Sequence, residues 1–184
     1  LSLDGALAFG VAEPHEAAEL KAAMACGSIP EKPVQILSAI LPDEIEDMIR
    51  LDVTLPVIDF ETAELIDAAA KRQKKTAKVH VKIDSGMGRL GIRLDGAQDE
   101  TAKWLRKAGK GSSLEIEGIF THLPMAYEPL DPFTGGQIAR FSAFIRNLER
   151  EGVTFKYRHI AASDAINNFP QTFAPPFNLV RTGI

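Results

Sequence analysis

Short apolar runs alternate with helix-like segments along the whole chain, and this alternation restricts the possible folds more than any other feature of the sequence. Apolar runs and two-residue alternation predict strands near 6–11, 34–37, 53–58, 79–84, 114–121, 157–161 and 177–180. Helical spacing predicts helices over 13–26, 42–49, 59–74, 97–108 and 137–150, and a short helix from 163. Strands separated by helices indicate an α/β protein with parallel strands, because parallel neighbours need long crossover connections.

The alternation fits either an open doubly wound sheet or a (β/α)8 barrel of the TIM type. No Gly-x-Gly-x-x-Gly stands at the first strand–helix junction, which disfavours a dinucleotide-binding sheet. Polar residues follow several predicted strands, and barrel active sites lie at those strand ends. We therefore favour the barrel, although 184 residues fall short of the ~250 of a complete one.

Charge and cysteine content point away from several kinds of partner. The formal net charge is −4 and the basic residues are scattered, which argues against nucleic acid or an anionic membrane as a partner. Cys26 is the single cysteine, so no internal disulfide can form, as is usual in the cytoplasm. Cys26 and the histidines show no zinc-ligand spacing, and we expect no metal site. No apolar run approaches the ~18 residues of a membrane span, and no signal peptide is visible.

The strand over 79–84 leads into the most informative turn of the chain. Apolar and polar residues alternate up to Asp84, and three glycines follow between positions 86 and 91. Lys82 lies inside the strand and Arg89 lies just after it. An enzyme that holds an anionic substrate or cofactor would use two cations placed in this way. The spacing alone fits a core strand followed by a tight surface turn equally well.

Polar residues that could carry chemistry also stand in or just after the later predicted strands. They are His122, His159, Ser163, Arg181 and Gly183. In many barrels the loops after the last two strands bind phosphate, for which a hydroxyl and backbone amides are suitable donors. Taken singly, each residue has an ordinary structural explanation, such as a hydrogen-bonded histidine at a loop start or a simple turn.

Residues 82–91, Lys-Ile-Asp-Ser-Gly-Met-Gly-Arg-Leu-Gly, resemble the Lys-x-Asp-Thr-Gly-Met-x-Arg-Leu-Gly signature of alanine racemases. Ser85 keeps the hydroxyl of the usual Thr. Later segments match in order: Gly-Ile-Phe-Thr-His at 118–122, Gln and Phe at 137 and 141, His-Ile-Ala-Ala-Ser at 159–163, and Val-Arg-Thr-Gly-Ile at 180–184. The resemblance covers residues 8–184.

Alanine racemases combine a TIM-type barrel with a C-terminal β domain and use pyridoxal 5'-phosphate (PLP). The resemblance therefore implies that residues 1–184 form one PLP-binding domain, an incomplete barrel without its first strand and without the β domain. The PLP-binding lysine would precede Leu1 and the catalytic tyrosine would follow Ile184. We therefore expect an internal piece, inactive alone, of a homodimeric cytoplasmic enzyme that supplies D-alanine for peptidoglycan.

The resemblance also assigns roles around the cofactor. Arg181 would hydrogen-bond the pyridine nitrogen of PLP and leave that nitrogen unprotonated. The Ser163 hydroxyl and the amides of Gly183 and Ile184 would hold the phosphate. His159 would lie behind these groups.

The resemblance assigns the remaining site residues to the substrate side. Arg89 would contact the phenolic oxygen of PLP and the substrate carboxylate. Lys82 would be carbamylated and would orient Arg89, because a carbamate is an anion that can accept from Arg. His122 would link Arg181 to the catalytic tyrosine.

Two departures keep other functions open. Ala162 replaces the Asn of the family pattern, and Leu-Pro-Met follows His122 in place of Phe-Ala. A racemase of serine or of broad specificity is the first alternative. A non-catalytic PLP-binding barrel is the second, although the Lys82–Arg89 signature argues against it. An unrelated α/β binding module with a structural glycine turn is the third.

Overall fold

The computed structural model describes residues 5–95, 98–108 and 111–183. The chain divides into two compact units. Unit 1 comprises Leu1–His80 and Gly111–Glu115, and unit 2 comprises Val81–Lys110 and Ile116–Ile184. Strands β4 (Ala77–Asp84) and β6 (Leu114–Phe120) begin in unit 1 and end in unit 2.

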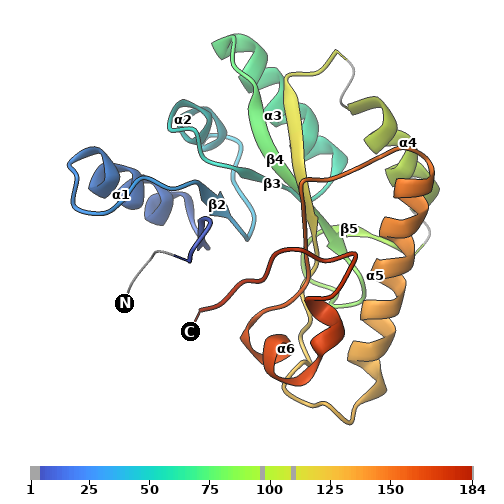
Figure 1. Ribbon diagram of the computed structural model, residues 1–184. Helices are drawn as coiled ribbons and strands as arrows, with labels where there is room; N and C mark the ends of the chain where they lie inside the picture. Colours follow the sequence, from blue (N-terminus) through green and yellow to red (C-terminus); the bar gives the residue numbers. More distant parts are fainter. Residues whose placement is uncertain (1–4, 96–97, 109–110, 184) are drawn as a thin grey trace. The chain divides into compact units, whose positions relative to one another are not determined.

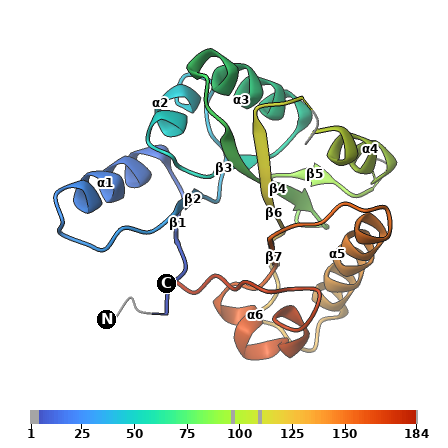
Figure 2. The ribbon, with the colours of Figure 1, turned by 45° about the horizontal axis from the view of Figure 1, so that its top comes forward.

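Unit 1 alternates short strands with helices, as the sequence predicts. Its elements before β4 are β1 (Phe9–Val11), α1 (Pro14–Ala25), β2 (Val34–Ile36), α2 (Ile45–Arg50), β3 (Leu55–Val57) and α3 (Phe60–Gln73). β1 pairs in parallel with β2, with Phe9 opposite Val34, and β3 neighbours β4. The three helices follow one another on the same side of β1, β2 and β3 (Figure 2).

Local signals in the sequence explain where these helices begin and end. The Asp59 carboxylate accepts a hydrogen bond from the Thr62 amide over 2.7 Å, which confirms Asp59 as the N-cap of α3. The Glu16 carboxylate accepts from the Glu13 amide at the start of α1 over 2.9 Å. After α1, Gly27 has a φ of +76°, a conformation that glycine adopts without strain. Apolar strand residues then fill the interior of unit 1 and are fully buried: Val34, Ile36, Leu55 and Val57.

Unit 2 contains the ends of β4 and β6 together with the rest of the chain. Its other elements are β5 (Ile92–Arg93), α4 (Gln98–Ala108), α5 (Pro132–Arg150), β7 (Tyr157–His159), α6 (Ser163–Asn168) and a 3-10 turn, η1 (Pro170–Thr172). β5 pairs in parallel with β4, β6 neighbours β4, and β7 pairs in parallel with β6. Helices α4 and α5 lie on the same side of these strands in both views (Figures 1 and 2).

The apolar stripe predicted on the long helix is confirmed. Ile138, Phe141, Ile145 and Leu148 of α5 are all buried, and the Phe141 ring stacks on Phe177 with centroids 6.0 Å apart. The helix begins at Pro132, five positions before the predicted start. The Asp131 carboxylate accepts from the Phe133 amide over 2.7 Å, and proline is favoured in the first turn of a helix.

The predicted last strand over 177–180 is wrong, since within the described part of the chain its sheet pairing is limited to an isolated bridge between Leu179 and His159. The Asn178 side chain explains the difference. Its carbonyl oxygen accepts from the Arg158 amide over 2.8 Å, and its amide nitrogen donates to the Lys156 carbonyl over 2.8 Å. A side chain thus takes backbone bonds that a continuous ladder would use.

No helix in the described part of the chain is long and apolar enough to cross a membrane.

Candidate active site

The turn after β4 is held by the last residue of that strand. Asp84 is buried, and its carboxylate accepts from the amide of Gly86 over 2.9 Å and from that of Gly88 over 2.9 and 3.1 Å. Gly91 closes the turn with a φ of +119°, and a Cβ there would lie 2.9 Å from the backbone of Lys82 and Asp84. Only glycine permits this approach. The turn therefore has a defined backbone, from which the exposed Arg89 side chain extends.

Lys82 lies inside the site rather than on the surface. Its side chain is buried, and its ammonium nitrogen lies 5.4 Å from the centroid of the Phe120 ring. Burial, followed by the positive charges of Arg89 and Arg181, lowers the pKa of Lys82 to about 8, while Asp84 opposes the shift. A lysine with this pKa is partly neutral at physiological pH.

The Arg181 side chain is held in place by hydrogen bonds. Its guanidinium donates to the Thr121 carbonyl over 3.0 Å, to the Ile160 carbonyl over 3.2 Å and to His159 Nδ1 over 2.6 Å. Arginine has no acceptor, so His159 accepts at Nδ1 and carries its proton on Nε2. Burial lowers the pKa of Arg181 to about 10, which leaves the guanidinium charged at neutral pH.

The Phe120 ring is the common neighbour of these groups. The His159 ring is fully buried and stacks on it with centroids 4.8 Å apart and planes within 1°. The Arg181 guanidinium carbon lies 5.6 Å from the same ring centroid. Phe120 thus contacts two cations and one histidine, and its ring attracts the cations electrostatically.

The pKa of His122 is affected by the positive charge of the site. His122 is half-buried, and burial, followed by the charges of Arg181, Arg89 and Lys82, lowers its pKa to about 4. Three cations therefore act on one imidazole, which stays neutral from pH 5 to 8. The structure brings Lys82, Arg89, His122 and Arg181 together, although the sequence places them over a span of 100 positions.

Ser163 and Gly183 also meet, although twenty residues separate them. The Ser163 hydroxyl donates to the Gly183 carbonyl over 2.8 Å, and the Gly183 amide approaches the same hydroxyl over 3.4 Å. Ser163 is the first residue of α6, and Ala162 at the N-cap supplies no side-chain acceptor. Ile184, which the sequence assigns to the same group, lies outside the described residues.

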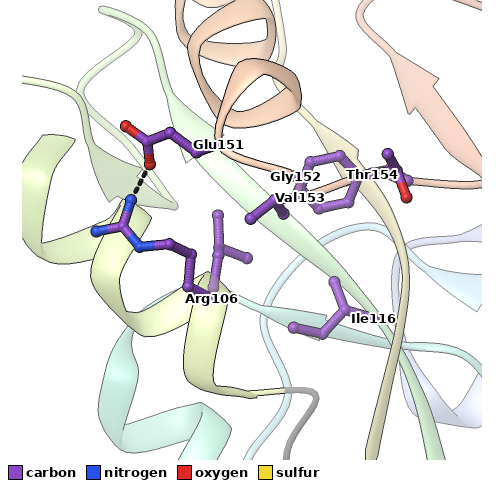
Figure 3. Close-up of a pocket in the computed structure, with 8 residues that line it drawn as sticks. Arg106, Ile116, Glu151, Gly152, Val153 and Thr154 are labelled. Carbon is purple, nitrogen blue, oxygen red and sulfur yellow. Dashed lines mark hydrogen bonds and ion pairs between the residues drawn. The ribbon is translucent and has the colours of Figure 1, made fainter.

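A cavity of about 480 Å³ lies elsewhere in unit 2. Figure 3 shows it between the end of α4 and the segment that joins α5 to β7, with the ion pair of Arg106 and Glu151 beside it. Its lining includes Ile116, Val153 and Phe155. None of its lining residues is a predicted site residue, so this cavity is not the candidate active site.

Sequence reasoning missed several residues that shape the site. Asp84, Ser85 and Thr121 stand inside the quoted motifs but receive no role there. Arg140 donates to the Ser85 carbonyl over 2.8 and 3.2 Å. A signal existed for Asp84, since Asp followed by glycines commonly caps a turn. Among the described residues, no group of three potential metal-ligating side chains comes together.

A family model described as the N-terminal domain of alanine racemase matches residues 1–184. Among curated proteins, the chain is similar to the alanine racemase of Desulforamulus reducens, with 38% identity over 180 residues, 98% of this chain and 46% of the relative. The alanine racemase of Methanococcus maripaludis shares 34% identity over 182 residues, again 98% of this chain and 46% of the relative. The chain thus spans about half the length of the curated relatives it matches.

Solved structures give the same result for the fold. Alanine racemase of Clostridium difficile 630, in complex with cycloserine, superposes with a TM-score of 0.86 at 30% identity and covers 98% of this chain and 47% of that chain. The Streptomyces coelicolor A3(2) enzyme superposes with a TM-score of 0.87 at 27% identity, over 97% of this chain and 46% of that one. These likenesses confirm the predicted fold class, an incomplete TIM-type α/β barrel.

Proposed function

Because the chain belongs to the alanine racemase N-terminal domain family, we propose that the whole protein is a PLP-dependent racemase that interconverts L- and D-alanine. The family depends on PLP, in agreement with the cofactor predicted from the sequence. One observation carries the proposal beyond family membership. Lys82, Arg89 and Arg181 place their positive charges around His122, and the Lys82 ammonium and the Arg181 guanidinium both lie against the Phe120 ring, a site that favours anionic ligands.

The residues present fit the proposed cofactor. PLP carries a phosphate dianion, a phenolic oxygen and a pyridine nitrogen, and each needs a donor. Arg89, Arg181 and the Ser163–Gly183 pair offer donors of these kinds on three different segments. When bound, PLP supplies an electron-withdrawing ring that makes the proton on the substrate Cα easier to remove.

Arg181 is the proposed partner of the pyridine nitrogen. Its hydrogen bonds to two carbonyls and to His159 fix the guanidinium in one orientation. Because the guanidinium stays charged and can only donate, it would hold the pyridine nitrogen of bound PLP as an unprotonated acceptor. PLP held in this way would be a weaker electron sink, which would disfavour side reactions such as transamination.

Ser163, Gly183 and Ile184 are the proposed phosphate group. The Ser163 hydroxyl already contacts the Gly183 backbone, so a phosphate at this point would meet a hydroxyl and backbone amides together. Donors of this kind suit a dianion. His159, which contacts Arg181, is proposed to lie behind these groups.

Arg89 and Lys82 are proposed to act on the substrate side. The exposed Arg89 guanidinium can receive a carboxylate in a two-point contact. With a pKa of about 8, about a tenth of Lys82 is neutral at pH 7. A neutral amine can add to carbon dioxide and release one proton to form a carbamate, and the resulting anion would accept from Arg89.

His122 is proposed to link Arg181 to a tyrosine base. Racemisation needs two bases, because the Cα proton leaves one face and returns on the other. By family resemblance these are a lysine before Leu1 and a tyrosine after Ile184, with the tyrosine supplied across a homodimer. A neutral His122 can accept a hydrogen bond at one nitrogen and donate at the other, as such a link requires.

We place the enzyme in the cytoplasm, where its D-alanine would enter peptidoglycan synthesis. The single Cys26 fits a reducing compartment. The partners are a small amino acid and a second copy of the protein.

A racemase of serine or broad specificity is the second candidate. Ala162 in place of Asn and the Leu-Pro-Met segment after His122 both change the surroundings of the ligand. Competition between alanine and serine for the same enzyme, measured as the ratio of kcat/KM values, separates the two candidates.

Borohydride reduction of the whole protein from its native cells, followed by mass analysis of its fragments, tests the proposal. We expect PLP fixed on a lysine ahead of Leu1 and conversion of L-alanine to D-alanine before reduction. The isolated 184-residue chain with added PLP is the control, and we expect no racemisation from it. A whole protein without a PLP adduct would favour the non-catalytic barrel, and racemisation by the isolated chain would contradict the assignment of the two bases.

A further inference from the structure

A buried hydroxyl pair links the turn that carries Arg89 to the strand that leads to His122. Ser85 Oγ and Thr121 Oγ1 lie 2.9 Å apart, and the two residues are only 2% and 1% exposed. The Gln137 side-chain amide, also buried, donates to the Ser85 hydroxyl over 3.3 Å. Loss of a hydrogen bond is costly in such surroundings, because water cannot replace the lost partner.

Thr121 contacts the other half of the site through its backbone. Its carbonyl accepts from Arg181 over 3.0 Å, and its amide donates to the His159 carbonyl over 3.2 Å. Thr121 therefore binds Arg181 and His159 through its backbone, and it contacts the turn that carries Arg89 through its hydroxyl.

Ser85, which carries the other hydroxyl of the pair, is the first residue of the turn after β4. It lies between Asp84, which caps the turn, and Gly86, the first of the three glycines. Its carbonyl accepts two hydrogen bonds from Arg140. A shift of Ser85 would therefore move the start of the turn from which Arg89 extends.

We propose that Ser85 and Thr121 are positioning residues, whose mutual hydrogen bond sets the separation of Arg89 and Arg181 and so matches the site to the length of the bound cofactor and substrate. The inference rests on the proposed function, because it needs both arginines to contact one ligand assembly. Neither hydroxyl belongs to the groups proposed to contact the cofactor or the substrate. Small displacements of binding groups cost large factors in rate, so a single lost hydrogen bond has a measurable effect.

The test uses the whole protein and removes one hydroxyl at a time. Thr121→Val keeps the shape of the side chain and removes its hydroxyl, whereas Thr121→Ser keeps the hydroxyl. Ser85→Ala removes the other member of the pair, and Ser85→Thr restores a hydroxyl there. Thr134→Val is the matched control, because Thr134 of α5 is equally buried but its hydroxyl has no hydrogen-bond partner among the described residues.

We expect Thr121→Val and Ser85→Ala each to lower kcat/KM for alanine by about 10- to 100-fold, mostly through KM. The double variant should lose no more than either single variant, because both remove the same contact. Thr121→Ser and Ser85→Thr should recover most of the loss, and Thr134→Val should match the wild type.

A second measurement does not depend on turnover. Binding of PLP to the apoprotein, followed by fluorescence quenching, should weaken several-fold in both Thr121→Val and Ser85→Ala, because each removes the hydroxyl contact that sets the separation of the two arginines. Thermal unfolding of every variant shows whether a loss of activity is only a loss of folding.

Two results would overturn the inference. One is additive losses in the double variant, and the other is a Thr121→Ser variant as impaired as Thr121→Val. A wild-type protein that binds no PLP and racemises no amino acid would instead overturn the proposed function. The two failures are therefore distinguishable.

Discussion

Two arginines of the candidate site are held in opposite ways. Arg181 follows an irregular segment, and its side chain is fixed by three acceptors. Arg89 stands on a turn whose backbone is fixed by Asp84, while its side chain is exposed. A side chain that is already bound can hold a permanent ligand in one orientation. An exposed side chain on a fixed backbone can close on a ligand that arrives and leaves, so the difference supports the proposed cofactor contact of Arg181 and the proposed substrate contact of Arg89.

The first test of this comparison, with the largest expected effect, removes the Arg181 side chain. Arg181→Leu leaves the Thr121 and Ile160 carbonyls and His159 Nδ1 without their donor, and we expect unfolding to become easier by about 4 kcal/mol. Urea denaturation measures the change. Arg158→Leu, which also removes an arginine with backbone acceptors, is the comparison. A loss below about 1 kcal/mol would show that Arg181 is not held as described.

The second prediction uses His122 as a probe of both arginines. Its pKa in the folded protein is about 4, below the ~6.5 of an unfolded histidine. Between these values the unfolded chain binds the proton and the folded protein does not, so stability is complete above pH 6.5 and falls by up to about 3 kcal/mol as the pH drops to 4.

Urea denaturation across this pH range, on the wild type and on His122→Gln, isolates the contribution of His122. The substitution should flatten the pH dependence of stability between pH 4 and 6.5. Equal curves for the wild type and His122→Gln would contradict the charged surroundings of this residue.

The third prediction addresses the backbone that carries Arg89. Gly91→Ala places a methyl group 2.9 Å from two backbone atoms at a φ of +119°, and we expect a loss of about 2 kcal/mol in stability. Gly88→Ala has a φ of +74° but open space around the new methyl group, so it should lose only about 1 kcal/mol. Thermal unfolding of both variants checks the order, and the reverse order would contradict the described turn.

The smallest effect on stability should come from the Arg89 side chain itself. Arg89→Leu should change the free energy of unfolding by less than about 0.5 kcal/mol, because the side chain is exposed. Its effect should appear as a large rise in the KM for alanine, by about 100-fold for a lost carboxylate contact. A clear loss of stability with an unchanged KM would reverse the comparison between the two arginines.

Local patterns made much of the fold predictable from the sequence. The N-cap at Asp59 and the apolar stripe of α5 depend on residues within a few positions of one another, and both are confirmed. The strand at 177–180 failed because the Asn178 side chain competes for backbone partners. The two-residue strand β5 was missed, because its pairing follows from the return of the chain at Gly91.

The sequence predicted which residues belong to the site but not which of them contact one another. The motifs located Lys82, Arg89, His122 and Arg181, yet nothing in their spacing shows that they share one electrostatic environment. The Ser85–Thr121 pair joins residues 36 positions apart, and two hydroxyl residues give no pattern by which a sequence could pair them. Contacts of this kind depend on strand order, which is fixed only in the folded chain.

The turn between β4 and β5 has a thermodynamic consequence. Its two ends are tied side by side, with Ile83 opposite Ile92 and Asp84 opposite Arg93. Residues 85–91 therefore behave as a small closed ring rather than an open loop. The conformational entropy of such a ring is lost when the protein folds, and little remains to be lost when a ligand reaches Arg89. Longer or more flexible versions of this ring should shift that entropy loss to the binding step and weaken ligand affinity without removing any contact.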